Sequence, residues 1–377
     1  MTIPKDFGYT DDHELLRKTA RRLFSAKCAV SEIRRLADDD IGFSGELYQE
    51  MAELGWLGLV LPESVGGADL DTLSLAMVLE EMGRCLLPSP FLGSVLAALA
   101  IRRTGGDDIA RRWLPDIVTG KTIATIALSE PDASWEPESV RSRAERTAGG
   151  YALSGTKTHV MWGQHAGILV APFLENDERA LFAIELPRPG VTIEPEVCID
   201  GTRRTARITL ANARVDDSAR IGGDSVEALR WIHTIGFVMT AAELLGCSEA
   251  VLSITRDYAN ERIQFARPIG SFQAVKHPIV NVMIDLEMTR SLVVGAAAAL
   301  DHEPERAEML SRMAKASATD SCLFACDRGI QTHGGFGFTW DCDVHFYYKR
   351  ALWGAATLGD GRHHRRKLAE ILQDLEA

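Results

Sequence analysis

The segment VEALRWIHTIGFVMTAAELLGCSEAVLSITRDYANERI (residues 226–263) indicates the fold most directly. Its apolar residues recur at steps of three and four and cover a broad face, which is typical of a long buried helix. Two more segments of this kind follow at 273–300 and 304–334, and a shorter one ends the chain at 365–377. Because long helices with broad apolar faces bury one another, residues 225–377 are predicted to form a four-helix bundle.

The first third of the chain has the same helical period, in three segments that Gly and Pro interrupt: 14–26, 45–59 and 71–87.

Between about 122 and 222 the period changes to two. Short apolar or alternating runs alternate there with polar turns: TIATIALS (122–129), YALSGTKTHVM (151–161), GILVAPF (167–173), RALFAIEL (179–186), GVTIEP (190–195) and RTARITLANARV (204–215). This spacing predicts a small β-sandwich or barrel. The predicted fold class is therefore mainly α with a small β domain (α+β). We expect an N-terminal helical domain (1–121), a central β domain (122–224) and a C-terminal helical bundle (225–377).

Composition excludes several classes of function. Apolar residues make up 46% of the chain and charged residues 25%, which is ordinary for a soluble globular protein. The net charge of -12 argues against binding to nucleic acid or to an anionic membrane, because both require a basic face. The seven cysteines show no zinc or redox spacing, so we expect reduced thiols, no metal site and a cytoplasmic location. No signal peptide and no run of roughly 18 uninterrupted apolar residues is evident, so no membrane span is expected.

Four stretches carry a family resemblance: LGWLGLVLPESVGG (54–67), ALSEP (127–131), YANERIQFARPIGSFQAVKH (258–277) and QTHGGFGFTWDCDVHFYYKRA (331–351). In this order they resemble the signatures of the FAD-dependent acyl-CoA dehydrogenases. PSPF (88–91) and the form of the last stretch are most similar to the bacterial branch that degrades sterol and aliphatic acyl-CoA esters. The resemblance implies an oxidoreductase of lipid metabolism, in fatty acid or steroid degradation. It would be an oligomer, a dimer of dimers, with an acyl-CoA substrate and electron-transfer flavoprotein or a similar acceptor.

The resemblance also implies cofactor contacts in the C-terminal half. FAD has an anionic pyrophosphate, so it requires fixed cations and backbone donors. Arg262 and Gln273 match family positions at the pyrophosphate and adenine end. Gln331, Gly334 and Gly335 match positions that meet the adenosine half of a flavin held mainly by a neighbouring subunit. The alternatives are an outer-face ion pair for Arg262 and a helix C-cap for the two glycines.

Two residues of the β domain match contacts at the flavin edge. They are Leu128 and Ser129, within ALSEP. The alternative for both is an ordinary strand end. Nearby, the family's Trp-Ile-Thr reads His159-Val160-Met161, and Met161 lacks the hydroxyl that the family threonine uses toward the flavin.

The catalytic base departs from the family pattern. Family enzymes remove the α-proton of an acyl thioester with a glutamate while the β-hydride moves to flavin N5. The usual glutamate aligns with Leu358, and the alternative one aligns with Gly236. Glu243 is the acidic residue two helical turns after Gly236, on nearly the same face, and is the remaining candidate base. The alternative is that Glu243 faces solvent or holds an arginine across a helix interface.

Three functions remain open at this stage. The first is α,β-dehydrogenation of an acyl-CoA thioester by this chain. The second is a non-catalytic partner subunit of an α2β2 acyl-CoA dehydrogenase, which helps to form the flavin site of its partner. The third is a related flavoenzyme on the same fold, such as an oxidase or hydroxylase.

Overall fold

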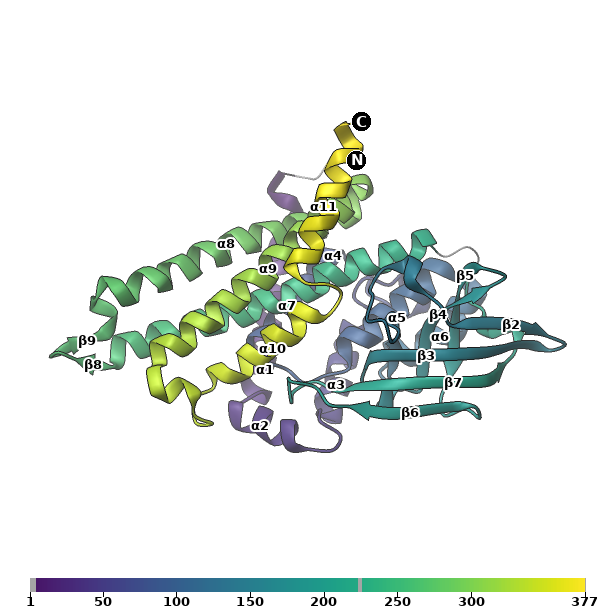
Figure 1. Ribbon diagram of the computed structural model, residues 1–377, viewed down its shortest axis with the longest axis horizontal. Coiled ribbons are helices and arrows are strands. Elements are labelled where there is room, and N and C mark those ends of the chain that lie inside the picture. The colour runs from purple at the N-terminus through teal and green to yellow at the C-terminus, as the bar shows by residue number, and fades with distance from the viewer. Residues whose placement is uncertain (1–4, 223–225, 377) are drawn as a thin grey trace. The chain divides into compact units, whose positions relative to one another are not determined.

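The computed structural model describes residues 5–222 and 226–376 (Figure 1). The chain forms two compact units, each built from separate stretches of sequence. We call them the helical unit (Met1–Arg35, Asp71–Leu87 and Thr234–Ala377) and the mixed unit (Leu36–Leu70 and Pro88–His233). The three-domain division proposed from sequence stays a prediction, and its boundary between residues 224 and 225 lies outside the described residues.

The helical unit contains most of the long helices. Its elements are η1 (Lys5–Gly8), α1 (Asp11–Lys27), α4 (Thr72–Arg84), most of α7 (Val226–Glu261), β8 (Ile263–Gln264), β9 (Arg267–Pro268), η7 (Ile269–Ser271), α8 (Gln273–His302), α9 (Pro304–His333), η8 (Gly334–Phe338), α10 (Val344–Ala356) and α11 (Gly361–Glu376). Helix α2 (Val30–Asp38) has residues in both units. In this unit α8 packs along α9, and α10 and α11 pack on α9 (Figure 1). The apolar helical periods of the sequence therefore correspond to packed helices.

Helices α4 and α7 cross with their backbones in contact. A Cβ atom on Gly83 would lie 1.9 Å from the carbonyl oxygen of Glu243, and one on Gly246 would lie 1.8 Å from that of Glu80. Only glycine permits so close a crossing. The carboxylate of Asp71 begins α4 by accepting a hydrogen bond from the backbone N–H of Ser74 at 2.8 Å. The crossing fixes where the acidic side chains of both helices lie.

The mixed unit contains the sheet and the shorter helices. Its elements are α3 (Gly45–Glu53), η2 (Trp56–Gly58), η3 (Glu63–Val65), α5 (Phe91–Thr104), α6 (Asp107–Val118), β1 (Ala124–Ile126), η4 (Pro137–Ser139), β2 (Arg143–Thr147), β3 (Gly150–Met161), η5 (Gly163–His165), β4 (Ile168–Glu175), β5 (Glu178–Glu185), β6 (Val191–Glu196), β7 (Thr205–Val215) and η6 (Asp217–Ala219). The strands β1 to β7 form one curled sheet in the order β1-β4-β2-β3-β7-β6, and β5 pairs with β4. Leu153, Phe173, Phe182 and Ile208 are among its buried core. Helical segments around a small β region confirm the predicted fold class.

Helix α7 is the one helix among the described residues that is long and apolar enough to cross a membrane. However, 89% of its most apolar window is buried inside the protein. Burial of this kind is what a core helix requires, so its apolar character is explained by packing.

Candidate functional site

The end of helix α7 places Arg262 at the surface. The backbone N–H of Arg262 donates to Tyr258 O at 2.9 Å, and its carbonyl accepts from Ile269 N at 2.9 Å, across the β8–β9 hairpin. Its side chain is exposed, and no carboxylate pairs with it in the described part of the chain. The outer-face ion pair considered for Arg262 is therefore absent there. Gln273 is also exposed and begins α8, after the same hairpin.

The end of helix α9 forms an open glycine loop. Gly334 has a φ of +63°, and its N–H donates to carbonyls of the last helical turn, so it does serve as the C-cap of α9. A Cβ atom on Gly334 or Gly335 would meet no heavy atom within 4 Å. Gln331 is exposed beside them. The loop therefore leaves room for another group to approach its backbone.

An aromatic stack connects these two places. The ring of Tyr258, on α7, stacks on the ring of His333, the last residue of α9, with centroids 4.2 Å apart. His333 is buried and its Nδ1 lies 2.8 Å from Gly329 O. Tyr258 is four residues before Arg262, and His333 precedes Gly334. The stack therefore places an exposed, unpaired guanidinium and an open glycine loop at neighbouring helix ends.

Leu128 and Ser129 lie in the mixed unit and are buried, at 7% and 0% exposure. The carbonyl of Ser129 accepts from Thr158 N at 3.0 Å, in an isolated bridge to β3. The next residue, Glu130, accepts at 2.7 Å from the buried ammonium of Lys157. These bonds hold the ALSEP turn against β3, just before the altered residues 159–161.

Glu243 is the residue proposed from sequence as the base. Its side chain is 2% exposed, and its Oε1 accepts from Arg350 Nη1 of α10 at 2.7 Å. Arg350 is 1% exposed, and its Nη2 donates to Leu86 O at 3.2 Å. Glu243 thus holds an arginine across a helix interface, which is one of the alternatives considered for it. Leu358, at the position of the usual family glutamate, is 2% exposed.

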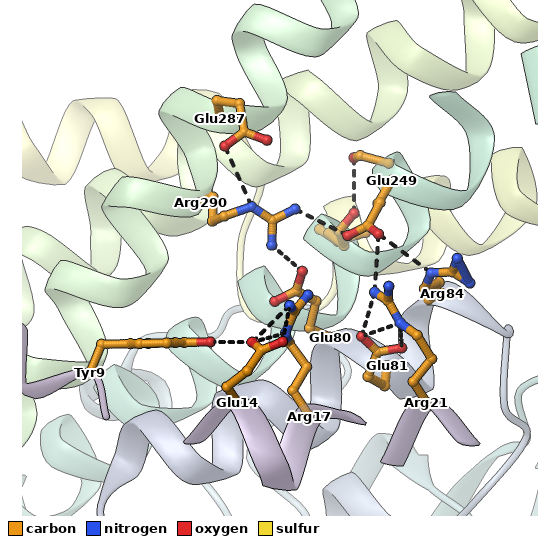
Figure 2. A network of polar contacts seen from close by, with 12 residues as sticks. Tyr9, Glu14, Arg17, Arg21, Glu80, Glu81, Arg84, Glu249, Glu287 and Arg290 are labelled. Carbon is orange, nitrogen blue, oxygen red and sulfur yellow. Dashed lines mark hydrogen bonds and ion pairs between the residues drawn. The ribbon is translucent and has the colours of Figure 1, made fainter. Parts of the chain in front are cut away.

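A second charged network lies beside this pair in the helical unit. Figure 2 shows Glu80 of α4 paired with Arg290 of α8, while Glu249 of α7 accepts from both Arg290 and Arg21. Arg21 also pairs with Glu81 at 2.7 Å. The network borders a cavity of about 640 Å³ lined by residues of α1, α4, α7 and α8. Each arginine that lines this cavity is paired with a carboxylate, unlike Arg262. The paired arginines are Arg17, Arg256 and Arg290.

Sequence reasoning missed the buried cations, of which Arg350 and Lys157 are two. Arg350 lies on the buried face of α10 at helical spacing from Phe346, Tyr347 and Gly354. Lys157 occupies an inward position of β3 and is 0% exposed. In both cases the signal was available, because a cation at an apolar position of a periodic pattern requires a buried partner.

The comparisons with known proteins agree with this arrangement. Residues 10–121 match the family described as "Acyl-CoA dehydrogenase, N-terminal domain", and residues 234–373 match "Acyl-CoA dehydrogenase, C-terminal domain". The chain therefore belongs to the acyl-CoA dehydrogenase family. Its members are FAD-dependent oxidoreductases that act on a CH–CH bond of an acyl-CoA.

Relatives match along nearly the whole chain. The acyl-CoA dehydrogenase FadE27 of Mycobacterium tuberculosis is 30% identical over 380 residues, which cover 99% of this chain and 100% of that one. The benzylmalonyl-CoA dehydrogenase of Aromatoleum aromaticum is 30% identical, over 91% of this chain and 93% of that one. Among solved structures, a chain of the ChsE4-ChsE5 complex from Mycobacterium tuberculosis has a TM-score of 0.90 at 29% identity, and the match covers 99% of each chain.

Proposed function

We propose that this chain works as a FAD-dependent acyl-CoA dehydrogenase, which introduces an α,β double bond into an acyl-CoA thioester. The observation that supports this most, beyond membership of the family, is the exposed Arg262, which has no carboxylate partner among the described residues, beside the open loop at Gly334 and Gly335. FAD, when bound, supplies the acceptor for the hydride. The residues of the chain bind and orient the cofactor and substrate and move the proton.

The residues at the ends of α7 and α9 fit an FAD pyrophosphate and adenosine. A guanidinium without a carboxylate partner is available for a phosphate, and Arg262 provides one. Gln273 lies across the hairpin from it and would contact the adenine end. Gln331, Gly334 and Gly335 would meet the adenosine half of a flavin held mainly by a neighbouring subunit. Gln331 is exposed, and at the two glycines no side chain stands between the backbone and an approaching group. These five assignments are part of the proposal.

Leu128 and Ser129 are proposed as contacts at the flavin edge. Their buried, hydrogen-bonded backbone is held by Thr158 and, through Glu130, by Lys157. A backbone fixed in this way can present its groups to a ring without reorganisation. These two assignments are supported by the positions of Leu128 and Ser129 in the sequence, which match the family motif.

Glu243 is the proposed base, and its environment favours a second candidate function. To take the α-proton, its carboxylate has to exchange the Arg350 guanidinium for the substrate. The aligned positions of the usual bases are Leu358 and Gly236, which cannot accept a proton. These observations favour a non-catalytic partner subunit of an α2β2 acyl-CoA dehydrogenase that helps to form the flavin site. The similarity to a chain of the ChsE4-ChsE5 complex is compatible with this candidate.

We further propose a substrate class, an electron acceptor, an oligomeric assembly and a cellular location for this activity. The names of relatives, which include a steroid acyl-CoA dehydrogenase at 29% identity, support a substrate from fatty acid or steroid degradation. Electron-transfer flavoprotein or a similar acceptor would reoxidise the flavin. A cytoplasmic homo- or hetero-oligomer, with no nucleic acid or membrane partner, is consistent with the acidic composition and the buried α7.

The visible spectrum of the purified chain tests the two candidates. A yellow chain that bleaches on addition of an acyl-CoA supports a dehydrogenase that acts alone. A colourless chain that becomes yellow only when co-expressed with a homologous partner supports the second candidate. For the base, Glu243→Gln should abolish bleaching if Glu243 takes the proton, and unchanged bleaching excludes it. A protein that binds no flavin in either preparation contradicts both candidates.

A further inference from the structure

The turn between α10 and α11 has an unusual backbone for its sequence. Leu358 has a φ of +59°, and the next residue, Gly359, has a φ of +96°. The left-handed region is uncommon for a residue such as leucine and is retained only where the surroundings impose it. The side chain of Leu358 is nevertheless 2% exposed, so the turn directs an aliphatic group inward. Contacts with surrounding residues must therefore hold the turn in this backbone conformation.

The turn Gly354–Asp360 comprises the last residues of α10 and its connection to α11, and Lys315 of α9 contacts both ends of it. Its side chain is fully buried, and its Nζ donates to Gly354 O at 2.8 Å and to Gly359 O at 2.9 Å. Thr319 Oγ1 lies 3.3 Å from the same nitrogen. Burial lowers the pKa of Lys315 to about 7. The bonds to the two carbonyls survive deprotonation, because a neutral amine keeps two hydrogens and can accept one from the threonine.

His364 contacts the middle of the same turn. Its ring is fully buried, its Nε2 lies 3.1 Å from Leu358 O, and its Nδ1 lies 3.5 Å from Arg312 Nη1. Burial and the neighbouring cations lower the pKa of His364 to about 2, so the ring is neutral. Nε2–H therefore donates to Leu358 O, while Nδ1 accepts from the guanidinium. Phe237 of α7 packs edge-on against the ring at 4.6 Å.

We propose that Lys315 is a positioning residue, which with His364 fixes the turn Gly354–Asp360 so that residue 358 stays where the family's usual glutamate aligns. In this proposal the turn retains the conformation that would position a catalytic base, and leucine occupies the position of that base. The meaning of position 358 rests on the proposed function. The contacts of Lys315 and His364 with the turn, which we call the clamp, are a property of the helical unit and do not depend on it.

The burial of Lys315 has a cost in free energy. A fully buried lysine without a carboxylate partner at hydrogen-bond distance is expensive, because desolvation disfavours its charge. Both carbonyls that it contacts belong to the turn, and so does the carbonyl that His364 contacts. The two side chains together satisfy three carbonyls in a turn of seven residues.

Hydrogen–deuterium exchange of the full-length chain tests the clamp directly. In Lys315→Met, which keeps an unbranched chain as far as Cε and lacks only the terminal amine, exchange in peptides that cover 354–361 should rise at least about tenfold, because donors to buried carbonyls are lost. Peptides from the middle of α7 and α8 should change little. In the matched control Thr319→Val, the turn should keep its protection. Unchanged exchange in the turn, or an equal rise throughout the helical unit, overturns the proposal.

A further variant keeps the test decisive. If Lys315→Met does not fold, His364→Phe replaces it, because phenylalanine keeps the ring contact with Phe237 and loses the donor to Leu358 O. A rise confined to 354–361 supports the proposal, and no rise overturns it. The exchange measurement needs no flavin, so its result is independent of whether the proposed function holds.

A gained activity tests the positioning role. The flavin-loaded Leu358→Glu chain, incubated with an acyl-CoA in deuterated water, should incorporate deuterium at the α-carbon: the carboxylate takes the α-proton and returns a deuteron. Leu358→Gln keeps Glu243 and measures the exchange that the chain supports without a carboxylate at position 358, so Leu358→Glu should exceed it. Adding Lys315→Met to Leu358→Glu should lower this exchange at least about tenfold, since a misplaced base loses its alignment. Equal exchange with and without Lys315 contradicts the positioning role. If the Leu358→Glu chain binds no flavin, that result contradicts the proposed function only. The amide hydrogen–deuterium exchange of Lys315→Met still decides whether the clamp exists.

Discussion

The guanidinium of Arg350 lies 2.7 Å from the carboxylate of Glu243, and both side chains are at least 98% buried. The two residues are 107 positions apart in sequence and belong to α10 and α7. The same guanidinium reaches Leu86 O, just after α4. The pair therefore ties three segments of the helical unit together, and the carboxylate that would act as base also has a structural role.

Removing one member of this pair should destabilise the chain strongly. Arg350→Met removes the buried cation that pairs with the Glu243 carboxylate, so we expect a loss of about 3–5 kcal/mol in the free energy of unfolding. The double variant Glu243→Gln/Arg350→Met should recover part of this loss. Urea denaturation measures both. The control Arg328→Met, which breaks an exposed contact with Asp327, should cost at most about 1 kcal/mol. Equal losses for Arg350→Met and the control would show that the buried pair is unimportant.

The charged network in Figure 2 should make the free energy of unfolding depend on pH. Burial raises the pKa of Glu80 from 4.5 to about 7, against the opposing attraction of Arg290. Between these two values the unfolded chain is ionised at Glu80 while the folded chain keeps the proton. The contribution of Glu80 to the free energy of unfolding therefore falls as pH rises through this window, by on the order of 3 kcal/mol.

Denaturation of the wild-type chain and of Glu80→Gln at several pH values checks this expectation. The amide does not titrate, so the variant should lose the decline between pH 4.5 and 7. Glu249, whose pKa is lowered by Arg290 and Arg21 against the effect of burial, stays charged across this window, and its negative charge helps to raise the pKa of Glu80. Parallel profiles for the two proteins would mean that Glu80 is ionised throughout.

Arg262 should contribute to cofactor binding and little to stability. It is exposed and no carboxylate holds it in the described ranges, so Arg262→Ala should leave the denaturation midpoint nearly unchanged. A charged hydrogen bond to phosphate is worth about 1.5–3 kcal/mol, so FAD affinity should fall roughly ten- to hundredfold. Flavin fluorescence during titration measures the affinity. Arg256→Ala is the control, because Arg256 is also exposed but pairs with Asp257. An unaltered FAD affinity in Arg262→Ala removes this residue from the cofactor site.

The sequence predicted the fold better than the site for a physical reason. Helical and strand periods are local, and they sufficed to predict the helical segments around a small β region. The ion pairs are not local: Glu243 meets Arg350, and Lys157 meets Glu130, through packing that no single segment encodes. The sequence could indicate that a lone carboxylate in an apolar helix needs a partner. It could not choose that partner among the arginines of the chain.

Substitutions at the two glycines that follow α9 can distinguish a structural role of the loop from a role in cofactor binding. Gly334 has a φ of +63°, so Gly334→Ala should destabilise the chain by about 1 kcal/mol through strain. Gly335 has no such φ, and an added Cβ would meet no atom of the chain within 4 Å, so Gly335→Ala should leave the free energy of unfolding unchanged. If the backbone at 335 meets the adenosine half of FAD, the same methyl group should weaken FAD binding in the assembled oligomer. Denaturation of the isolated chain and FAD titration of the assembly separate the two effects. A Gly335→Ala assembly that binds FAD as tightly as the wild type would show that the loop is only a helix cap, because the methyl group occupies the space that the cofactor would need.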